Sequence, residues 1–254
     1  MNTITDFSPE AVVIDAGSFP TNKLALRWLE GCRRIVCCDG AANRYLARGG
    51  VPWRIVGDCD SLAPEIRERY GEIIRRFPDQ ETNDQTKAVK YLASKGLRRI
   101  AILGATGLRE DHTLGNISLL IDYMREGVEA RAYTDYGVFI PASGERTIHC
   151  PVGTQVSIFN FGATDITAEG LRYPLRDFTS WWQGTLNETI APTFRISAAG
   201  PYLLYLTYPQ SQRQQLAKHS FWFATAANHN SFLYFCKNTT TAPSDELFIP
   251  HDTY

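Results

Sequence analysis

The sequence predicts an N-terminal α/β domain with a doubly wound, mostly parallel sheet, followed by an all-β sandwich. Up to about residue 135, short apolar runs alternate with segments of helical spacing, which is typical of parallel strands buried on both faces. After Gly137 the segments are short and alternate in polarity, with Thr, Gly and Pro between them, which is typical of antiparallel β structure. We therefore expect domains at 1–138 and 139–208 and a C-terminal tail at 209–254.

The first part divides into strands and helices in regular alternation. Strands are expected at 11–14, 34–38, 53–56, 72–74, 100–103 and 130–134, and helices near 24–29 and at 41–47, 64–70, 84–95 and 114–124. Pro64 suits the first turn of its helix, and Asn83 is a typical N-cap. Because strand–helix–strand crossovers are right-handed, this order predicts an open, doubly wound sheet.

The second part is expected to hold strands at 156–159, 193–196 and 202–205, with the domain boundary between 136 and 146. Its residues alternate between apolar and polar side chains, as in a half-buried strand. The tail is rich in aromatic residues at 221–223 and 232–235 and in Thr, Asn and Pro at 238–244. Its role is left open.

Composition excludes several classes of protein. The 254 residues carry a formal charge of −1, so no basic surface for nucleic acid is expected. No apolar run reaches the roughly 18 residues of a membrane span, and residues 1–16 lack the pattern of a signal peptide. Six cysteines show no regular spacing, which indicates reduced thiols and a cytoplasmic protein.

Acidic residues and glycines follow several of the predicted strands. Asp39 follows the second strand, Asp58 and Asp60 follow the third, and Gly104 follows the fifth. Asp84 opens the helix after the fourth strand. Ligands of doubly wound sheets lie outside the carboxyl ends of the strands, so we expect these residues at one edge.

The pair Asp58 and Asp60 predicts a metal site. Two carboxylates two residues apart point the same way in an extended segment, and Asp84 would add a third. Such a group is stable as anions when a cation lies between its members, and hard oxygen ligands suit Mg²⁺. Two simpler readings stay open: Asp-x-Asp can cap a turn, and Asp84 can form a surface ion pair with Lys87.

Further residues at this edge are suited to phosphate. Lys87 lies one turn beyond Asp84 and could reach a phosphate oxygen. The segment 104–107, which follows the fifth predicted strand, has a glycine at each end, so a phosphate or a base can come close to its backbone. It lacks the full dinucleotide-binding or phosphate-loop pattern. Arg109 offers a planar donor fork, whereas Asp111 could act as a helix cap.

Taken together, these motifs resemble thiamine pyrophosphokinases. Their order along the chain is that of the family: 39–44 (DGAANR), 57–61 (GDCDS), 79–87 (DQETNDQTK) and 104–112 (GATGLREDH). Two later segments, 170–175 (GLRYPL) and 184–188 (GTLNE), are similar to motifs of the family's second domain. The resemblance covers roughly residues 11 to 208 and does not include the tail.

The resemblance implies transfer of pyrophosphate from ATP to thiamine with Mg²⁺, in a homodimer whose active site lies at the interface. It implies metal-binding and catalytic roles for Asp58, Asp60 and Asp84. Implied nucleotide contacts are Asp39, Asn43, Asn83, Lys87, Gly104 and Arg109, and implied substrate contacts are Gln80, Asp111, His112, Thr185 and Asn187. The chain departs from the family at Leu186, where a serine usually stands.

Three other functions would share part of this pattern. A related diphosphokinase acting on a pterin alcohol would carry a similar acid group, but the segment 170–187 favours thiamine. A non-catalytic sensor would join a nucleotide domain to a β ligand-binding domain, yet nucleotide binding alone does not need three carboxylates. A metal phosphohydrolase would release phosphate without an alcohol acceptor.

Overall fold

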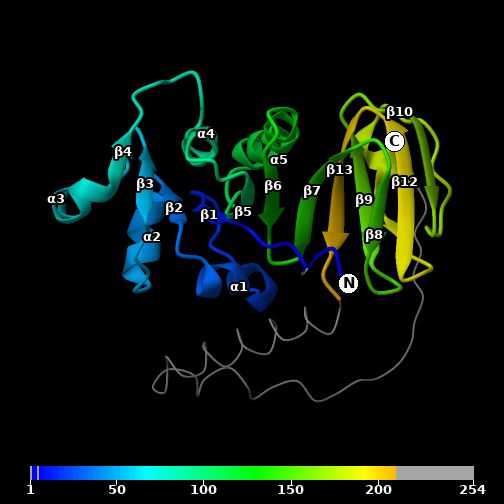
Figure 1. Cartoon of the computed structure of the whole chain (residues 1–254), viewed down its shortest axis with the longest axis horizontal. Coiled ribbons are helices and arrows are strands. Elements are labelled where there is room, and N and C mark those ends of the chain that lie inside the picture. Colours follow the sequence, from blue (N-terminus) through cyan, green and yellow to red (C-terminus); the bar gives the residue numbers. More distant parts are fainter. Residues whose placement is uncertain (1, 5, 210–254) are drawn as a thin grey trace, which may run out of the picture. The chain divides into compact units, whose positions relative to one another are not determined.

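The computed structural model describes residues 2–4 and 6–209. Their main feature is a ten-stranded sheet with the order β11-β9-β13-β7-β6-β5-β1-β2-β3-β4 (Figure 1). Strands β6, β5, β1, β2, β3 and β4 pair in parallel, whereas β7, β13, β9 and β11 pair antiparallel. The predicted fold class is confirmed, since a mostly parallel α/β part is followed by antiparallel β structure.

The parallel part follows the predicted alternation of strands and helices. Its elements are β1 (Ala11–Ile14), α1 (Lys23–Gly31), β2 (Ile35–Cys38), α2 (Ala41–Ala47), β3 (Arg54–Gly57), α3 (Pro64–Tyr70), a 3-10 turn η1 (Gly71–Ile73), β4 (Ile74–Arg76), α4 (Asp84–Ser94), β5 (Arg99–Leu103), α5 (Glu110–Arg125) and β6 (Glu129–Tyr133). Asn83 is the N-cap of α4, as predicted, and its side chain accepts a hydrogen bond from the Thr86 amide.

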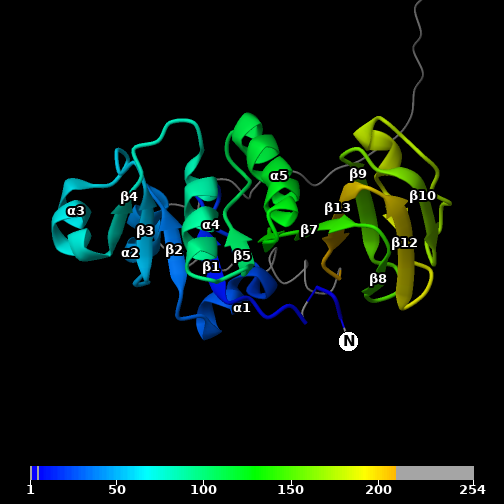
Figure 2. The same cartoon turned by 45° about the horizontal axis from the view of Figure 1, so that its top comes forward.

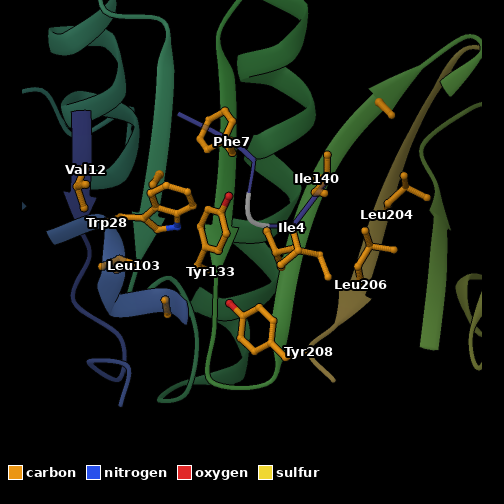
Figure 3. Packing of buried hydrophobic residues seen from close by; sticks show 14 of the residues in the cluster. Ile4, Phe7, Val12, Trp28, Leu103, Tyr133, Ile140, Leu204, Leu206 and Tyr208 are labelled. Carbon is orange, nitrogen blue, oxygen red and sulfur yellow. The ribbon is translucent and has the colours of Figure 1, made fainter. Parts of the chain in front are cut away.

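Helices cover both faces of this sheet. Val12 and Ile14 pack on the face that carries α1 and α2, whereas Ala11 and Val13 pack on the face of α4 and α5. In Figure 3, Trp28 of α1 lies beside Tyr133 of β6, with 5.4 Å between the ring centroids. Because every residue of β1 is fully buried, its sequence reads as a continuous apolar run.

The antiparallel part begins where β7 pairs with β6 through Ala132 and Phe139. Its elements are β7 (Gly137–Ser143), β8 (Arg146–His149), β9 (Gln155–Asn160), β10 (Thr164–Glu169), a 3-10 turn η2 (Trp181–Gly184), β11 (Asn187–Glu188), β12 (Thr193–Ala199) and β13 (Pro201–Thr207). A second sheet, β10-β12-β8, shares a core with β7, β9 and β13, which gives the sandwich seen in Figure 2.

The structure differs from the predicted elements in a few places. The residues expected as a strand at 72–74 form mainly the turn η1, and β4 follows at Ile74–Arg76. The sequence did not indicate β4, because two of its three residues are arginines and it therefore lacks an apolar pattern. Helix α5 begins at Glu110, four residues earlier than expected, since its first turn is polar. Strands β7, β8, β10 and β11 were not anticipated. β8, β10 and β11 are short or mostly exposed, whereas β7 lies in the region 136–146 where the domain boundary was expected.

The predicted division at 138/139 falls within the ten-stranded sheet. Hydrogen bonds between β6 and β7 join the two parts, so the sandwich extends the parallel sheet directly. The division at 138/139 lies inside β7, and the two-domain organisation stays a prediction. Except for Pro209, the predicted tail lies outside the described residues.

Among residues 2–4 and 6–209, none of the helices has the length and apolar character that crossing a bilayer requires. The five cysteines in this part of the chain are free thiols. Cys37 and Cys38 are buried, and burial raises the pKa of both thiols. They therefore behave as small core residues rather than as reactive groups.

Candidate active site

The strand order reverses between β1 and β5, which is where a doubly wound sheet binds its ligand. The loops that leave these strands lie against each other: the Gly17 amide donates to the Gly104 carbonyl (2.7 Å) and the Ser18 amide to the Thr106 carbonyl (2.7 Å). A Cβ at Gly17 would lie 2.3 Å from the Gly104 oxygen. Only glycine fits this approach of two backbones.

Three carboxylates meet beside this point, at the ends of β2 and β3. One oxygen from each of Asp39, Asp58 and Asp60 lies within 4.8 Å of the other two. Asp84 is adjacent, because a Cβ at Gly57 would lie 2.8 Å from the Asp39 Cβ and 3.3 Å from Asp84 Oδ1. The structure thus brings Asp58 and Asp60 together as expected, with Asp39 as the third close carboxylate and Asp84 at its side.

The backbone that presents these acids is unusual. Asp39 and Cys59 have positive φ angles, 33° and 69°, which residues with a Cβ rarely adopt. Side chains and amides fix the turns: the Ser61 amide donates to Asp39 Oδ2 (3.1 Å) and the Asp60 amide to Asp58 Oδ1 (3.3 Å). Strained backbone of this kind concentrates at functional sites.

Asn43, an expected nucleotide contact, holds the same loop. Its Nδ2 donates to the Ser61 carbonyl (2.8 Å), and its Oδ1 accepts from the Ala63 amide (3.2 Å). The side chain therefore fixes the loop after β3 from helix α2. A contact between Asn43 and nucleotide stays a prediction.

Lys87 and Asp84 form an ion pair at the start of α4, with 3.1 Å between Lys87 Nζ and Asp84 Oδ1. It is not a surface pair, because the Lys87 side chain is only 5% exposed and that of Asp84 30%. The buried ammonium lies beside the acids, where it would balance part of their charge. This is where a phosphate-binding lysine was expected, and that role stays a prediction.

The pKa values of the acids are shifted in different directions. Burial, followed by the nearby Asp84, raises the pKa of Asp39, and burial also raises the pKa of Asp84, with Asp58 and Asp60 adding to it. The amide of Asp60 lowers the pKa of Asp58. Clustered, poorly solvated carboxylates thus resist ionisation unless a cation compensates them.

This arrangement fits Mg²⁺. The donors are hard carboxylate oxygens, which Mg²⁺ prefers. Asp39 Oδ1 is buried and has no hydrogen-bond partner among the described residues. Such an atom needs either a proton or a cation. Asp39, Asp58 and Asp60 could therefore hold the ion, with Asp84 beside them at the start of α4.

Gln80 and Asn83 have different hydrogen-bond partners in the structure. Gln80 Nε2 donates to Asp58 Oδ2 over a long 3.4 Å. Asn83 Nδ2 donates to Asn116 Oδ1 (2.9 Å), and Asn116 Nδ2 donates to the Ala105 carbonyl (3.1 Å). Asn116 therefore ties the start of α4 to the loop after β5. Contacts of Gln80 and Asn83 with substrate or nucleotide stay predictions.

Arg109, Asp111 and His112 lie at the start of α5, after the Gly104–Gly107 turn. Arg109 pairs with Asp111 (2.5 Å), and both side chains are more than half exposed. The Asp111 carboxylate also accepts from the His112 amide (2.9 Å). All three are thus at the carboxyl edge of the sheet and open to solvent. Their ligand contacts stay predictions.

Thr185 and Asn187 do not join the acids within one chain. Asn187 lies on β11, eight steps in the strand order from β3, which corresponds to roughly 40 Å at about 4.8 Å per step. Its buried side chain accepts from the Tyr173 amide (3.1 Å) and donates to the Tyr173 carbonyl (2.8 Å). Thr185 Oγ1 donates to the Trp182 carbonyl (2.7 Å).

Sequence reasoning missed two residues at the site. Asp15 directly follows β1 and is buried; its Oδ1 accepts from the Ala16 amide (2.7 Å), and its Oδ2 has no partner among the described residues. An acid directly after the first strand was the available signal. Asn116 lies inside α5, and no local pattern distinguishes it from a surface residue.

Comparison with known proteins agrees with this geometry. The family model described as thiamin pyrophosphokinase, catalytic domain, matches residues 25–132, and the one described as thiamin pyrophosphokinase, substrate-binding domain, matches residues 137–205. A relative from Oryza sativa subsp. japonica, named thiamine pyrophosphokinase 1, is 30% identical over 197 residues, which cover 65% of this chain and 73% of the relative.

Solved structures share the fold. The thiamine pyrophosphokinase of Bacillus subtilis has a TM-score of 0.65 and 22% identity over 78% of this chain and 98% of its own. The thiamin pyrophosphokinase of Candida albicans has a TM-score of 0.65 and 19% identity over 79% of this chain and 90% of its own. With both family models matched in order and the acid group formed at the sheet edge, the chain belongs to the thiamine pyrophosphokinase family.

Proposed function

We propose that this chain transfers the pyrophosphoryl group of ATP to the hydroxyl of thiamine, giving thiamine diphosphate and AMP. The thiamine oxygen bonds to the β-phosphorus of ATP, and the bond from that phosphorus to the bridging α,β-oxygen breaks. AMP leaves with that oxygen, and the hydroxyl proton passes to a base. Such transfers depend on positioning and charge neutralisation more than on covalent help.

The close approach of Asp39, Asp58 and Asp60 supports this proposal most directly, because their oxygens lie within 4.8 Å of one another at the ligand-binding edge of the sheet. When bound there, Mg²⁺ would supply a positive charge for the phosphate oxygens. A carboxylate of this acid group would accept the hydroxyl proton.

The neighbouring residues have roles in positioning ATP. Lys87 lies beside Asp84, where its buried ammonium can meet a phosphate oxygen. The loops after β1 and β5 are in close backbone contact at Gly17 and Gly104, where the strand order reverses. Without side chains at these glycines, a phosphate or a base can come close to the backbone. Arg109 is exposed and can turn from Asp111 to phosphate.

We further propose a homodimer whose partner chain completes the thiamine site. Two observations support it: Thr185 and Asn187 lie far from the acids of their own chain, and exposed apolar side chains stand next to them. Trp182 is 75% exposed and Leu186 is 78% exposed, which suits a covered surface. Sedimentation at the assay concentration tests this assembly, and a monomer with full activity would contradict it.

We also propose a cytoplasmic location. The described cysteines are free, and most of them are buried, which suits a reducing compartment. Fractionation of the source cells, with an antibody to the chain, would test the location.

The function is tested by mixing the full chain with ATP and thiamine and measuring AMP and thiamine diphosphate. We expect equal amounts of both products with Mg²⁺ and a fall to background with EDTA, since no cation then neutralises the phosphates. A pterin alcohol added in equal concentration should not compete.

Each rival function gives a different result in this assay. Faster AMP formation with the pterin alcohol would favour the related diphosphokinase. Phosphate release without any alcohol would indicate a phosphohydrolase. Binding of ATP and thiamine without product would indicate a sensor.

A further inference from the structure

The loop from Asp58 to Leu62, between β3 and α3, presents two of the three close carboxylates. Cys59, between these two carboxylates, has a φ of 69°, which is unfavourable for a residue with a Cβ. A cavity of about 550 Å³ borders the loop, so apolar packing does not hold it from that side. Asn43 holds the end of this loop at Ser61 and Ala63, and on the cavity side polar groups can hold the rest of it.

Two arginines from the next elements of the chain supply hydrogen bonds to this loop. Arg67 of α3 donates from Nη2 to the Asp60 carbonyl (2.8 Å) and from Nε to the Leu62 carbonyl (3.0 Å). Arg76 of β4 donates from Nε to the Asp58 carbonyl (3.1 Å). Both arginine side chains line the cavity together with the loop residues.

The direction of these bonds separates two roles. The guanidinium groups bond to backbone oxygens rather than to the carboxylates, so they fix where the carboxylates point without neutralising them directly. As positive charges, however, they oppose binding of a second cation nearby. Removal of an arginine would therefore tighten cation binding if charge dominated, and weaken it if positioning dominated.

We propose that Arg67 and Arg76 are positioning residues, which hold the loop so that Asp58 and Asp60 face a divalent ion. This inference rests on the proposed function, since it needs the ion site at Asp39, Asp58 and Asp60. The arginines act through the Asp58, Asp60 and Leu62 carbonyls and do not touch the ion.

The test measures Mn²⁺ binding to the full chain without nucleotide. The EPR signal of free Mn²⁺ reports how much of the ion remains unbound. We expect Arg67→Gln and Arg76→Gln each to raise the Kd for Mn²⁺ about three- to tenfold. Arg76→Lys keeps the charge and one donor, so its Kd should fall between those of Arg76→Gln and the parent chain. Circular dichroism and thermal unfolding confirm that each variant folds.

Arg75→Gln is the matched control. Arg75 precedes Arg76 on β4 but donates to the Glu72 and Ile74 carbonyls, away from the loop. Its variant loses the same charge and should keep its Kd within about twofold of the parent. The KM for ATP at saturating Mn²⁺ should change less than the Kd for Mn²⁺ in Arg67→Gln and Arg76→Gln.

Unchanged or tighter Mn²⁺ binding in both glutamine variants would overturn the inference while leaving the proposed function intact. A raised KM for ATP with unaltered Mn²⁺ binding would also overturn it and assign the arginines to phosphate. If the parent chain bound no Mn²⁺, the ion site of the proposed function would fail, and this inference with it.

Discussion

Replacing Asp58 by alanine is expected to lower kcat for thiamine diphosphate formation at least about 10²-fold, because the reaction loses metal-assisted stabilisation of charge. Asp58 is one of the three carboxylates whose oxygens lie within 4.8 Å, so its loss leaves an incomplete set of ligands. Asp84→Ala should have an effect of similar size, since it also frees the buried Lys87 ammonium from its ion pair. The measurement is the initial rate of AMP formation across a Mg²⁺ titration.

Asp122→Ala is the matched control for both changes. Asp122 lies on α5 in an exposed ion pair with Arg125 (3.0 Å), and such pairs contribute little. Its variant should keep the parent rate within about twofold. A rate near that of the parent at saturating Mg²⁺ in Asp58→Ala or Asp84→Ala would remove that residue from the active site.

Asp15→Asn is expected to change the pH dependence of stability by about 3 kcal/mol. Burial raises the pKa of Asp15 from 3.8 to about 6, and each pKa unit corresponds to about 1.4 kcal/mol. In the folded chain the carboxyl group therefore keeps its proton to higher pH than in the unfolded chain. Its contribution to stability is full below about pH 4 and is lost as pH rises through about 6.

Chemical denaturation of both proteins, with EDTA, at pH 4 and pH 7.5 measures this effect. The free energy of unfolding of the parent relative to Asp15→Asn should fall by about 2.5 kcal/mol between the two pH values, because a small part of the full effect is already lost at pH 4. Any constant cost of an unpaired amide cancels in this difference. An equal difference in the free energy of unfolding between parent and variant at both pH values would show that Asp15 ionises as it does in the unfolded chain.

The buried parallel strands were the most predictable part of the fold. β1 is at the predicted residues, and α2 and α3 begin and end where predicted, because burial on both faces and Pro64 leave strong local signals. β4 and the start of α5 are polar, so their sequences carry no apolar period. Strand β11 has two residues, too few for any pattern.

The site was predictable as far as chain order allows. Asp58 and Asp60 follow one strand, so their proximity was expected from their spacing. The contact of Asp39 with them depends on β2 lying beside β3, and the place of Asp15 depends on β5 lying beside β1. The distance from Asn187 to the acids follows from the continuous sheet, which local sequence does not encode.

The central claim is that Asp39, Asp58 and Asp60 share one divalent ion. Crystals grown with Mn²⁺, measured at a wavelength where manganese scatters anomalously, test it most directly. We expect an anomalous peak within ligand distance of the Asp58 and Asp60 carboxylates, and no such peak in crystals of Asp58→Ala. A bound Mn²⁺ elsewhere in the parent chain, with no peak at these carboxylates, would contradict it.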